Sequence, residues 1–563
     1  MKLRRAVVLG VLLGLGQELA AQQLTSAEVA RVDSVFSAID GTARPGCALG
    51  VSRNGALVYQ RGYGMANLET GTAITPASIF HVASISKQFT AMAVALLAQD
   101  GRLSLDDDIR KYLPEVPDYG HRITLANLIR HTSGLRDQWN LLGMAGWRFP
   151  EDLITEQDVL DIVSRQRELN FTPGDEYSYS NSGYTLLAVI VKRVSGKSLR
   201  DFADERIFKP LGMTQTHFHD NHAMVVPGRT SAYEPGPPGP WKVSIPTFDT
   251  YGATSLFTTV GDLLTWEQNF ASAAVGGRGV IDAAQRPTTL NNGSALNYGY
   301  GLSLETYRGV VAVGHGGADA GYRADVVRFP DQGVAITALC NFSTAGPNGL
   351  TCKVADVVLE GSLQARPVAA GPAVSLTLTQ AQRDRLAGVY KRRQVDDALR
   401  VVAKDSGLVV LPYGIPLKAT SDTRFFAEGF PVEVVFDGPA GAAIREMRLV
   451  VGTEPPRVFD RMAPFAPSPS QLDAYAGEYY STELDTRYTV SRKDSVLAVR
   501  ARKIEPATLV AVFADAFQAV GAGTIRFERT RGRVTGFRLS DDRVRNVAFV
   551  RLPPAQVAGK PPQ

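Results

Sequence analysis

The sequence predicts an α/β (α+β) domain in which helices flank a central antiparallel sheet, followed by two small all-β domains. Strand patterns near residues 45–67 and 309–342 frame a long helical region, and one sheet built from both ends would make a single α/β domain. Beyond residue 376 the patterns change to short, evenly spaced strands that repeat, which is typical of small barrels or sandwiches. A chain of 563 residues, at ~150 residues per domain, also predicts three or four domains.

The first domain, residues 24–365, opens with two β-type runs joined through Arg53-Asn54-Gly55, a strong hairpin signal. Helix-period patterns follow, and three strand patterns return in "GVVAVGHGG", "GYRADVVRFP" and "GVAITALCNF". The predicted helices span residues 88–99, 125–130, 156–167, 183–194, 199–208 and 260–270, with one more near 350–359.

An internal repeat organises the rest of the chain. The motif "LAGVY" at 386–390 recurs as "YAGEY" at 475–479, and "KDSGLVV" from Lys404 recurs as "KDSVLAV" from Lys493, with an offset of 89 residues both times. Neither repeat shows a Ser/His/Asp or metal-ligand grouping, so we expect accessory domains. Their predicted bounds are 377–463 and 471–555, with linkers at 366–376 and 464–470.

The first 21 residues predict a signal peptide, since a basic start and an apolar stretch from Ala6 to Leu15 precede small residues at Ala20 and Ala21. We therefore expect a periplasmic or secreted protein. No later apolar run approaches the ~20 residues that cross a bilayer, so no stable membrane span is expected after cleavage. A net charge of +4 without a Lys/Arg run gives no reason to expect nucleic acid as a partner. The oligomeric state is left open.

Three cysteines, Cys47, Cys340 and Cys352, are too few for a disulfide framework and too scattered for a zinc site. In an oxidising compartment, we hypothesise that Cys340 pairs with Cys352 across a strand-to-helix connection. Cys47 would then be a small core residue.

Ser84 is the only serine in the chain with a lysine, Lys87, three places on. The next residues, "QFTAMAVALLAQ", are apolar nearly all round, so the helix should be buried with both side chains on one face. Desolvation favours a neutral lysine that accepts the serine proton, and a helix start offers N–H groups to an attacked carbonyl oxygen. The alternative is a capping Ser84 and a surface Lys87.

Two further stretches carry candidate groups. In "PGDEYSYSNSGY", a loop before an apolar helix holds Tyr179, which can relay protons, and Asn181, whose amide can bind a substrate carbonyl. In "VGHGGADAGYR", His315 ends a strand pattern, two glycines leave room for substrate, and the N–H of Ala318 offers a second oxyanion donor. Each stretch alone also fits a purely structural role.

A metal site is the rival interpretation. The stretch "HFHDNH" holds His217, His219, Asp220 and His222, but it has no supporting cluster elsewhere in the sequence. The stretch "SLDDDI" lacks the glycine and distal glutamate of a calcium loop. We therefore predict no metal and no cofactor.

Ser84-Ile-Ser-Lys87, Tyr179-Ser-Asn181 and His315-Gly-Gly317 together resemble the motifs of the serine β-lactamase/penicillin-binding-protein superfamily, over about residues 30–360. The class C-like branch, of peptidase S12 type, is the most similar. Further matches lie in "ITLANLIRHTSGL", "ERIFKPLGM", "YGATSLFTTVGDLLTW" and "YGYGL". The resemblance implies a β-lactamase/transpeptidase-like catalytic domain, and its D-aminopeptidase members carry two lipocalin-like barrels after it.

The resemblance also assigns roles to the motif residues: nucleophile for Ser84, proton transfer for Lys87 and Tyr179, substrate binding for Asn181, and an oxyanion hole for the N–H groups of Ser84 and Ala318. The third motif departs from the usual Lys-Thr-Gly, whose lysine and hydroxyl help to bind a substrate carboxylate. Here His315 and Gly316 stand before Gly317, a pattern that resembles the D-aminopeptidase and esterase members and predicts weaker carboxylate recognition.

The sequence therefore predicts a secreted serine hydrolase with a Ser-Lys-Tyr acyl-enzyme mechanism. Its expected partner is a small-molecule or peptide substrate, namely a small amide or peptide bearing D-residues, or an ester. A first alternative is a class C-like β-lactamase or penicillin-binding carboxypeptidase. A second is a penicillin-binding sensor or binding module without turnover.

Overall fold

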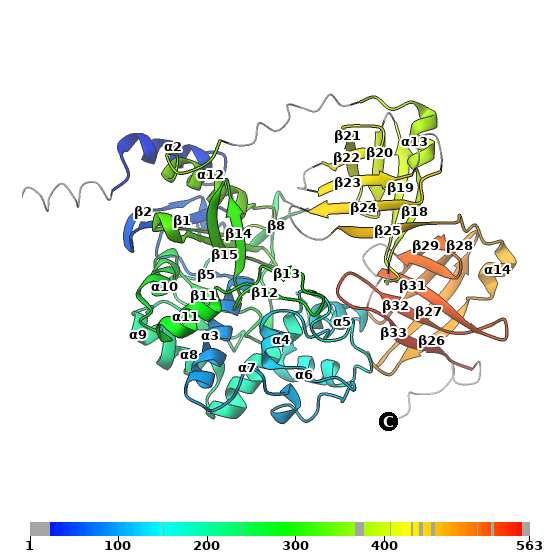
Figure 1. Cartoon of the computed structure of the whole chain (residues 1–563), viewed down its shortest axis with the longest axis horizontal. Helices are drawn as coiled ribbons and strands as arrows, with labels where there is room; N and C mark the ends of the chain where they lie inside the picture. Colours follow the sequence, from blue (N-terminus) through cyan, green and yellow to red (C-terminus); the bar gives the residue numbers. More distant parts are fainter. Residues whose placement is uncertain are drawn as a thin grey trace, which may run out of the picture. The chain divides into compact units, whose positions relative to one another are not determined.

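The structure is a computed structural model that describes residues 23–365 and 376–553 with short gaps. The predicted signal peptide and residues 366–375 of the predicted linker lie outside the described residues, as do positions 150, 238, 394, 406, 429–431, 439–442, 452–455, 504 and 520–522. No helix among the described residues is long and apolar enough to span a membrane. Two compact units are present (Figure 1): the second takes residues 136–148, 162–170 and those from 366 onward, and the first takes the remainder.

A six-stranded antiparallel sheet in the order β14-β15-β16-β17-β1-β2 forms the centre of the first unit. Both ends of the unit meet in it because β1 (Cys47–Arg53) pairs with β17 (Val334–Cys340). The predicted hairpin connects β1 to β2 (Ala56–Tyr63), with Asn54 and Gly55 at φ angles of 49° and 77°, as a two-residue hairpin turn requires. The predicted antiparallel sheet is therefore confirmed; its other strands are β14 (Ser303–Tyr307), β15 (Val310–Asp319) and β16 (Tyr322–Phe329).

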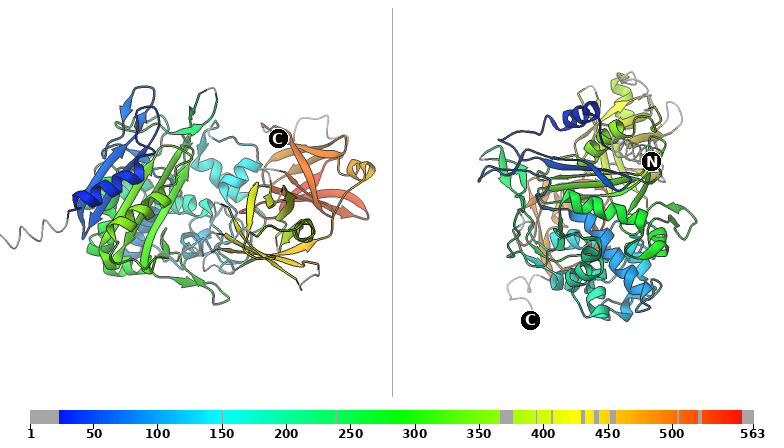
Figure 2. Two further views of the ribbon diagram at one scale, coloured as in Figure 1. Left: turned by 90° about the horizontal axis from the view of Figure 1, so that it is seen from above. Right: turned by 90° about the vertical axis from the view of Figure 1, so that its left-hand side faces the viewer.

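Helices cover both faces of this sheet (Figures 1 and 2). Helices α2 (Ser26–Phe36) and α12 (Pro347–Val358) contribute to one apolar core on the sheet. Helix α10 (Val260–Ser272) contacts β1 and β17, and it comes so close that a Cβ on Gly50 would lie 2.9 Å from the side chain of Leu264. A side chain at Gly50 would therefore push α10 away from the sheet.

The predicted helices are present with shifted ends. The pattern at residues 199–208 forms α8 (Leu199–Ala203), which continues as a π-helical turn (Asp204–Phe208) and α9 (Lys209–Leu211). Helix α2 was not predicted because only Val32 and Phe36 of its side chains are fully buried, which leaves a weak apolar period. The remaining α-helices that lie wholly in this unit are α3 (Ser86–Gln99), α4 (Leu125–Ile129), α7 (Asn181–Ser195) and α11 (Gly277–Ala284). Helix α6 (Glu156–Ser164) begins in this unit, and its residues from Ile162 onward belong to the second.

The predicted pair between Cys340 and Cys352 is wrong. Cys340 forms a disulfide with Cys47, and the two residues face each other in the β1–β17 register with Cα atoms 4.0 Å apart. Cys352 lies on α12. Closeness in sequence favours Cys352 as the partner, but the pairing of β1 with β17 joins residues that are 293 positions apart.

Two closed eight-stranded antiparallel barrels form most of the second unit, so both predicted barrels are confirmed. The sequence repeat is also a structural repeat: Tyr390 and Tyr479 occupy equivalent strands, and each donates a 2.7 Å hydrogen bond to the carbonyl four residues earlier. The first barrel contains β18 (Gly388–Arg392), β19 (Ala398–Lys404), β20 (Gly407–Leu411), β21 (Ile415–Ala419), β22 (Arg424–Ala427), β23 (Val432–Asp437), β24 (Glu446–Val451) and β25 (Arg457–Met462). The second contains β26 (Gly477–Ser481), β27 (Thr486–Lys493), β28 (Val496–Arg500), β29 (Ala507–Phe513), β30 (Ala516–Ala519), β31 (Gly523–Thr530), β32 (Arg533–Ser540) and β33 (Val547–Arg551).

Two segments that precede α7 in the sequence belong to this second unit. Arg136, just before α5 (Gln138–Met144), donates to Glu483 at 2.5 Å, and the two side chains are only 0% and 3% exposed. Asn170 accepts from the N–H of Arg545 and donates to the carbonyl of Arg543, both at 2.8 Å. Polar contacts inside the unit thus fix both segments to the second barrel.

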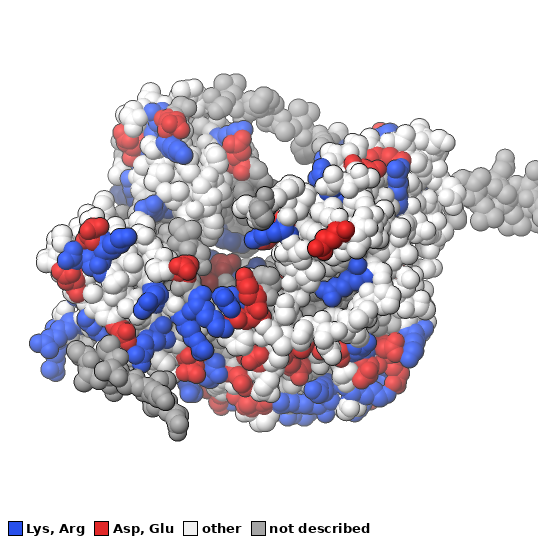
Figure 3. All heavy atoms as spheres, turned by 180° about the vertical axis from the view of Figure 1, so that it is seen from behind, with Lys and Arg blue, Asp and Glu red and all other residues white. Residues whose placement is uncertain are grey.

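Most other ion pairs lie at the surface, where Figure 3 shows basic and acidic side chains interspersed over the visible face. The pair between Arg393 and Asp460, for example, is 51% and 49% exposed. Exposed pairs contribute little to stability, whereas removal of one partner from a buried pair leaves an uncompensated charge.

We therefore expect Arg136→Met to lower the free energy of unfolding of the second unit by ~3–5 kcal/mol, because it leaves the buried carboxylate of Glu483 without its cationic partner. Urea denaturation followed by circular dichroism measures this change. The matched control, Arg393→Met, removes an exposed partner and should cost at most ~1 kcal/mol. Equal losses in the two variants would contradict the role assigned to the buried pair.

Candidate active site

Ser84 lies on a tight turn at the start of the buried helix α3. The turn is a short 3-10 helix (Ala83–Ile85), and Ala83 has a left-handed φ of 47°, which is uncommon for a residue with a Cβ atom. The N–H of Ala83 donates to His81 Nδ1 at 3.2 Å, and the Ser86 hydroxyl accepts from the N–H of Leu256 at 3.0 Å. These bonds hold the turn so that Ser84 is half-buried between fully buried neighbours.

Lys87, in the first turn of α3, is fully buried. Its Nζ donates to Ser84 Oγ at 3.0 Å, to Asn181 Oδ1 at 2.9 Å and to the carbonyl oxygen of Ala253 at 2.7 Å. It also lies 4.8 Å from the centre of the Tyr179 ring. The structure thus brings together four residues that the sequence singled out, and the alternative of a surface Lys87 is wrong.

The segment that carries Tyr179 and Asn181 is held by His131. Asn181 is the first residue of α7, and the N–H of the preceding Ser180 donates to His131 Nδ1 at 3.1 Å. His131 itself has a left-handed φ of 57°, and its ring lies 4.2 Å from that of Tyr179, centre to centre. The backbone bend at His131 therefore positions both candidate side chains.

The third motif lies on β15, which passes close to the Ser84 turn. A Cβ on Gly317 would lie 2.3 Å from the carbonyl oxygen of Val82, so no other residue fits there. A Cβ on Gly316 would meet no atom nearer than 3.8 Å. Strand β14 pairs with β15 only as far as Gly314, so from His315 onward the strand edge on that side has no β14 partner.

A chain of hydrogen bonds joins His131 to His315. His131 Nε2 lies 3.2 Å from the Tyr298 hydroxyl, which lies 3.0 Å from His315 Nε2, and His315 Nδ1 lies 2.6 Å from the carbonyl oxygen of Gly316. The two ends of the chain determine the direction of each hydrogen bond. At one end His131 Nδ1 accepts from the N–H of Ser180, and at the other end the carbonyl oxygen of Gly316 can only accept. His131 therefore donates to Tyr298, Tyr298 donates to His315 Nε2, and His315 carries its proton on Nδ1.

The charge state of His315 agrees with this order. Burial, together with the positive charge of Lys87, lowers the pKa of His315 to about 4. Burial also raises the pKa of Tyr298 well above its ordinary value, so its hydroxyl remains a donor. At neutral pH the third motif therefore offers a neutral imidazole, where a lysine would offer a positive charge.

Three contributors to this site were not predicted as site residues: His131, Tyr298 and the carbonyl of Ala253. Each lies in a stretch that the resemblance had drawn attention to, namely "ITLANLIRHTSGL", "YGYGL" and "YGATSLFTTVGDLLTW". Those stretches indicated importance, but a left-handed backbone and a tertiary hydrogen bond have no signature in one sequence.

The rival metal site does not form a ligand cluster. Among the described residues, no group of three or more His, Cys, Asp or Glu side chains is arranged to hold a metal ion. Of the candidate ligands, His219 and His222 instead line a pocket with His81 and Arg229, whereas Asp220 pairs with Arg200.

Comparison with known proteins supports the resemblance. A family model described as Beta-lactamase matches residues 32–358. A D-aminopeptidase from Brucella anthropi is 29% identical over 315 residues, which cover 56% of this chain and 59% of the relative, and one from Brucella canis is 30% identical over 298 residues, which cover 53% and 56%. The chain thus spans little more than half the length of these relatives.

A solved structure shares the fold. The octameric penicillin-binding protein homologue from Pyrococcus abyssi superposes with a TM-score of 0.53 at 21% identity, covering 77% of this chain and 98% of its own. At this identity the likeness concerns the fold alone. The β-lactamase/transpeptidase-like architecture predicted from the motifs is confirmed by this match and the family match together.

The neutral state of His315 can be measured. We expect the His315 ring to titrate near pH 4 in a pH series of histidine NMR spectra, and Lys87→Met to raise this pKa because a positive neighbour that disfavours the imidazolium is removed. The pKa should stay below its ordinary value because burial remains. The exposed Lys111→Met is the control and should leave it unchanged. Titration of His315 at its ordinary pKa in the unaltered protein would contradict the hydrogen-bond order.

Proposed function

Because this chain belongs to the beta-lactamase family, we propose that it is a serine hydrolase that forms an acyl-enzyme through Ser84. The observation that carries the proposal is the 3.0 Å contact between Lys87 Nζ and Ser84 Oγ. Lys87 is fully buried, so this contact is shielded from water on the lysine side. A weak nucleophile next to a buried amine is the arrangement that activates a serine for acyl transfer.

In the proposed acylation, Ser84 Oγ attacks the substrate carbonyl carbon and its proton passes to the Nζ of a neutral Lys87. The ammonium form of Lys87 donates to all three oxygens, whereas the neutral amine keeps two N–H groups for Asn181 and Ala253 and turns its lone pair to Ser84 Oγ, so that the hydrogen bond between Lys87 and Ser84 reverses direction. The bond to the leaving group then breaks, and the leaving atom takes up the transferred proton, assisted by Tyr179. Water next attacks the ester, its hydroxyl joins the acyl carbon, and its proton returns to Ser84 Oγ.

The N–H groups of Ser84 and Ala318 are the proposed oxyanion donors. The carbonyl of Gly316 accepts from the His315 ring, and backbone groups two residues apart in a strand point to the same edge. The N–H of Ala318 would therefore point to the edge that β14 leaves open. Two backbone donors in a poorly hydrated site stabilise the charge that develops on the carbonyl oxygen.

We propose substrates that lack a carboxylate next to the scissile bond, namely small amides or peptides bearing D-residues, or esters. The support is that His315 is neutral at physiological pH and that Gly316 has no hydroxyl, so the charge-assisted hydrogen bonds that a carboxylate prefers are missing. The D-aminopeptidase relatives agree with this choice. A β-lactamase, a carboxypeptidase and a sensor without turnover are the alternatives.

Export to the periplasm or beyond is part of the proposal. The N-terminal pattern of residues 1–21 supports it, and so does the disulfide between Cys47 and Cys340, since disulfides persist in oxidising compartments.

The substrate preference is tested by comparing turnover of D-alanine p-nitroanilide, short-chain p-nitrophenyl esters and nitrocefin. We expect the amide or the esters to exceed nitrocefin in kcat/KM. The double variant His315→Lys/Gly316→Thr restores a cation and a hydroxyl, and the free space at Gly316 accommodates the threonine. It should shift the ratio of kcat/KM values toward nitrocefin by about tenfold or more, because a hydrogen bond to a charged group contributes ~1.5–3 kcal/mol.

The single variant Gly316→Thr is the control, and it should shift the ratio less because it supplies no positive charge. Preference of the unaltered protein for nitrocefin would overturn the substrate class. Burst acylation without turnover of any substrate would favour the sensor.

A further inference from the structure

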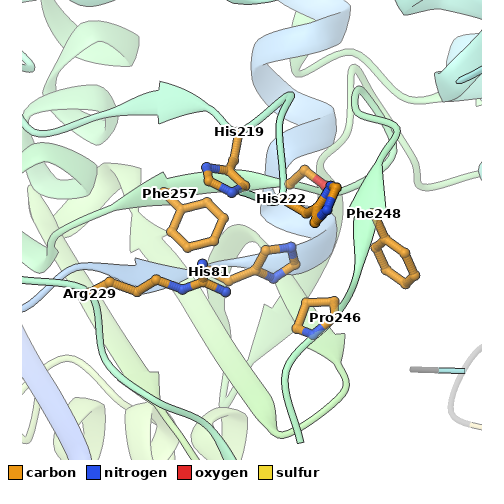
Figure 4. A pocket seen from close by; sticks show the side chains of 8 residues that line it. His81, His219, His222, Arg229, Pro246, Phe248 and Phe257 are labelled. Atoms are coloured by element: carbon orange, nitrogen blue, oxygen red, sulfur yellow. The ribbon is translucent and has the colours of Figure 1, made fainter. Parts of the chain in front are cut away.

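A polar pocket lies beside a small sheet in the first unit (Figure 4). The sheet consists of β5 (Phe80–His81), β11 (Leu256–Thr258) and β7 (His217–Phe218), in that order. The space among these residues measures about 250 Å³ and includes a part that is open to solvent, so only a small chemical group fits between the side chains. Its polar lining includes His81, His219, His222 and Arg229, and its apolar lining includes Phe248 and Phe257.

His219 is the unusual member of this lining. Its side chain is 96% buried, and neither ring nitrogen has a hydrogen-bond partner. Figure 4 shows the ring directed toward the space that His222 and Arg229 also face. Buried polar atoms nearly always have a partner, and an unmade hydrogen bond costs ~1–3 kcal/mol. A ligand that hydrogen-bonds His219 would remove this cost.

Arg229 supplies an uncompensated positive charge. Its guanidinium lies 5.0 Å from the centre of the Phe257 ring and bonds the Tyr322 hydroxyl, but within the described part of the chain it forms no ion pair with a carboxylate. The nearby acids are already occupied: Asp220 pairs with Arg200 at 2.6 Å, and Asp249 lies 3.0 Å from His222 Nδ1. Of the residues that line the pocket, Arg229 is the permanently charged one.

The histidines add hydrogen-bonding capacity without competing charge. Burial, followed by the charge of Arg229, lowers the pKa of His219 to about 4, so the ring is neutral at physiological pH and still carries one N–H donor. A cation in the pocket would be repelled by the guanidinium of Arg229. An anion would gain from it, because the planar guanidinium fork fits the oxygen atoms of carboxylate and phosphate groups.

We propose that this pocket binds a small oxyanion, a phosphate or carboxylate group, through the guanidinium of Arg229 and the imidazole of His219. His222, whose side chain is 41% exposed, stands at the mouth and offers Nε2. His81 forms part of the wall and also accepts the N–H of Ala83, so an occupant lies one side chain away from the Ser84 turn. The proposal does not depend on hydrolase activity.

Isothermal titration of the full chain with inorganic phosphate and, separately, with acetate tests the proposal. We expect one site per chain for at least one of the two ions. The ion that binds with the higher affinity shows whether the pocket prefers a phosphate or a carboxylate group. Arg229→Met and His219→Phe should each weaken binding at least tenfold. His219→Phe keeps a ring in the buried position, which avoids an empty cavity.

The matched control is Arg278→Met on α11, which removes one exposed positive charge without altering the pocket lining. It should bind as the unaltered protein does, and thermal unfolding checks that all variants are folded. The proposal is overturned if the folded, unaltered protein binds neither ion, if both pocket variants bind with unchanged affinity, or if His219→Phe instead abolishes stoichiometric binding of zinc.

Discussion

A lysine side chain buried away from water is the constraint on which the first unit depends. An ammonium group taken out of water is costly unless oxygen atoms replace the lost hydration. Lys87 receives three such oxygens, from Ser84 in the preceding turn, from Asn181 at the start of α7, and from the carbonyl of Ala253. Three segments that are distant in the sequence must therefore meet at one nitrogen atom, and this places Ser84 Oγ beside an amine.

The remaining geometry brings β15 to the same point. Gly317 permits the strand to approach Val82, and the left-handed residues Ala83 and His131 bend the chain around the nucleophile and around Tyr179. His315 then reaches the Tyr298 hydroxyl. Because burial and the charge of Lys87 keep His315 neutral, the site combines an activated serine with weak attraction for a carboxylate, which is why we place amides and esters ahead of β-lactams.

The sequence alone predicted the groups whose chemistry is recognisable by type and order. Ser84, Lys87, Tyr179 and Asn181 lie together as expected, and the 89-residue offset between repeats correctly indicated two barrels. Local patterns suffice for such features because helix burial and strand alternation are visible over a few residues.

Features that depend on tertiary pairing were missed. Cys340 pairs with Cys47 because β17 adds to β1 across the sheet, and no local pattern indicates that register. His131 and Tyr298 act through a backbone bend and a chain of bonds between distant segments. The sequence suggested only a metal site for the histidine-rich stretch. Arg229, which favours an anion over a metal cation in the same pocket, lies outside that stretch.

The central claim is that Ser84 becomes acylated in the course of the reaction. Acid quenching of the protein during turnover of a D-alanine ester, followed by peptide mass spectrometry, locates the acyl group directly. The account predicts an alanyl group on the peptide that contains Ser84, and its loss when the quench is delayed until substrate is exhausted. An acyl group on another residue, or steady turnover in which the Ser84 peptide is never modified, even in the earliest quenched samples and in a variant with slowed hydrolysis, would contradict it.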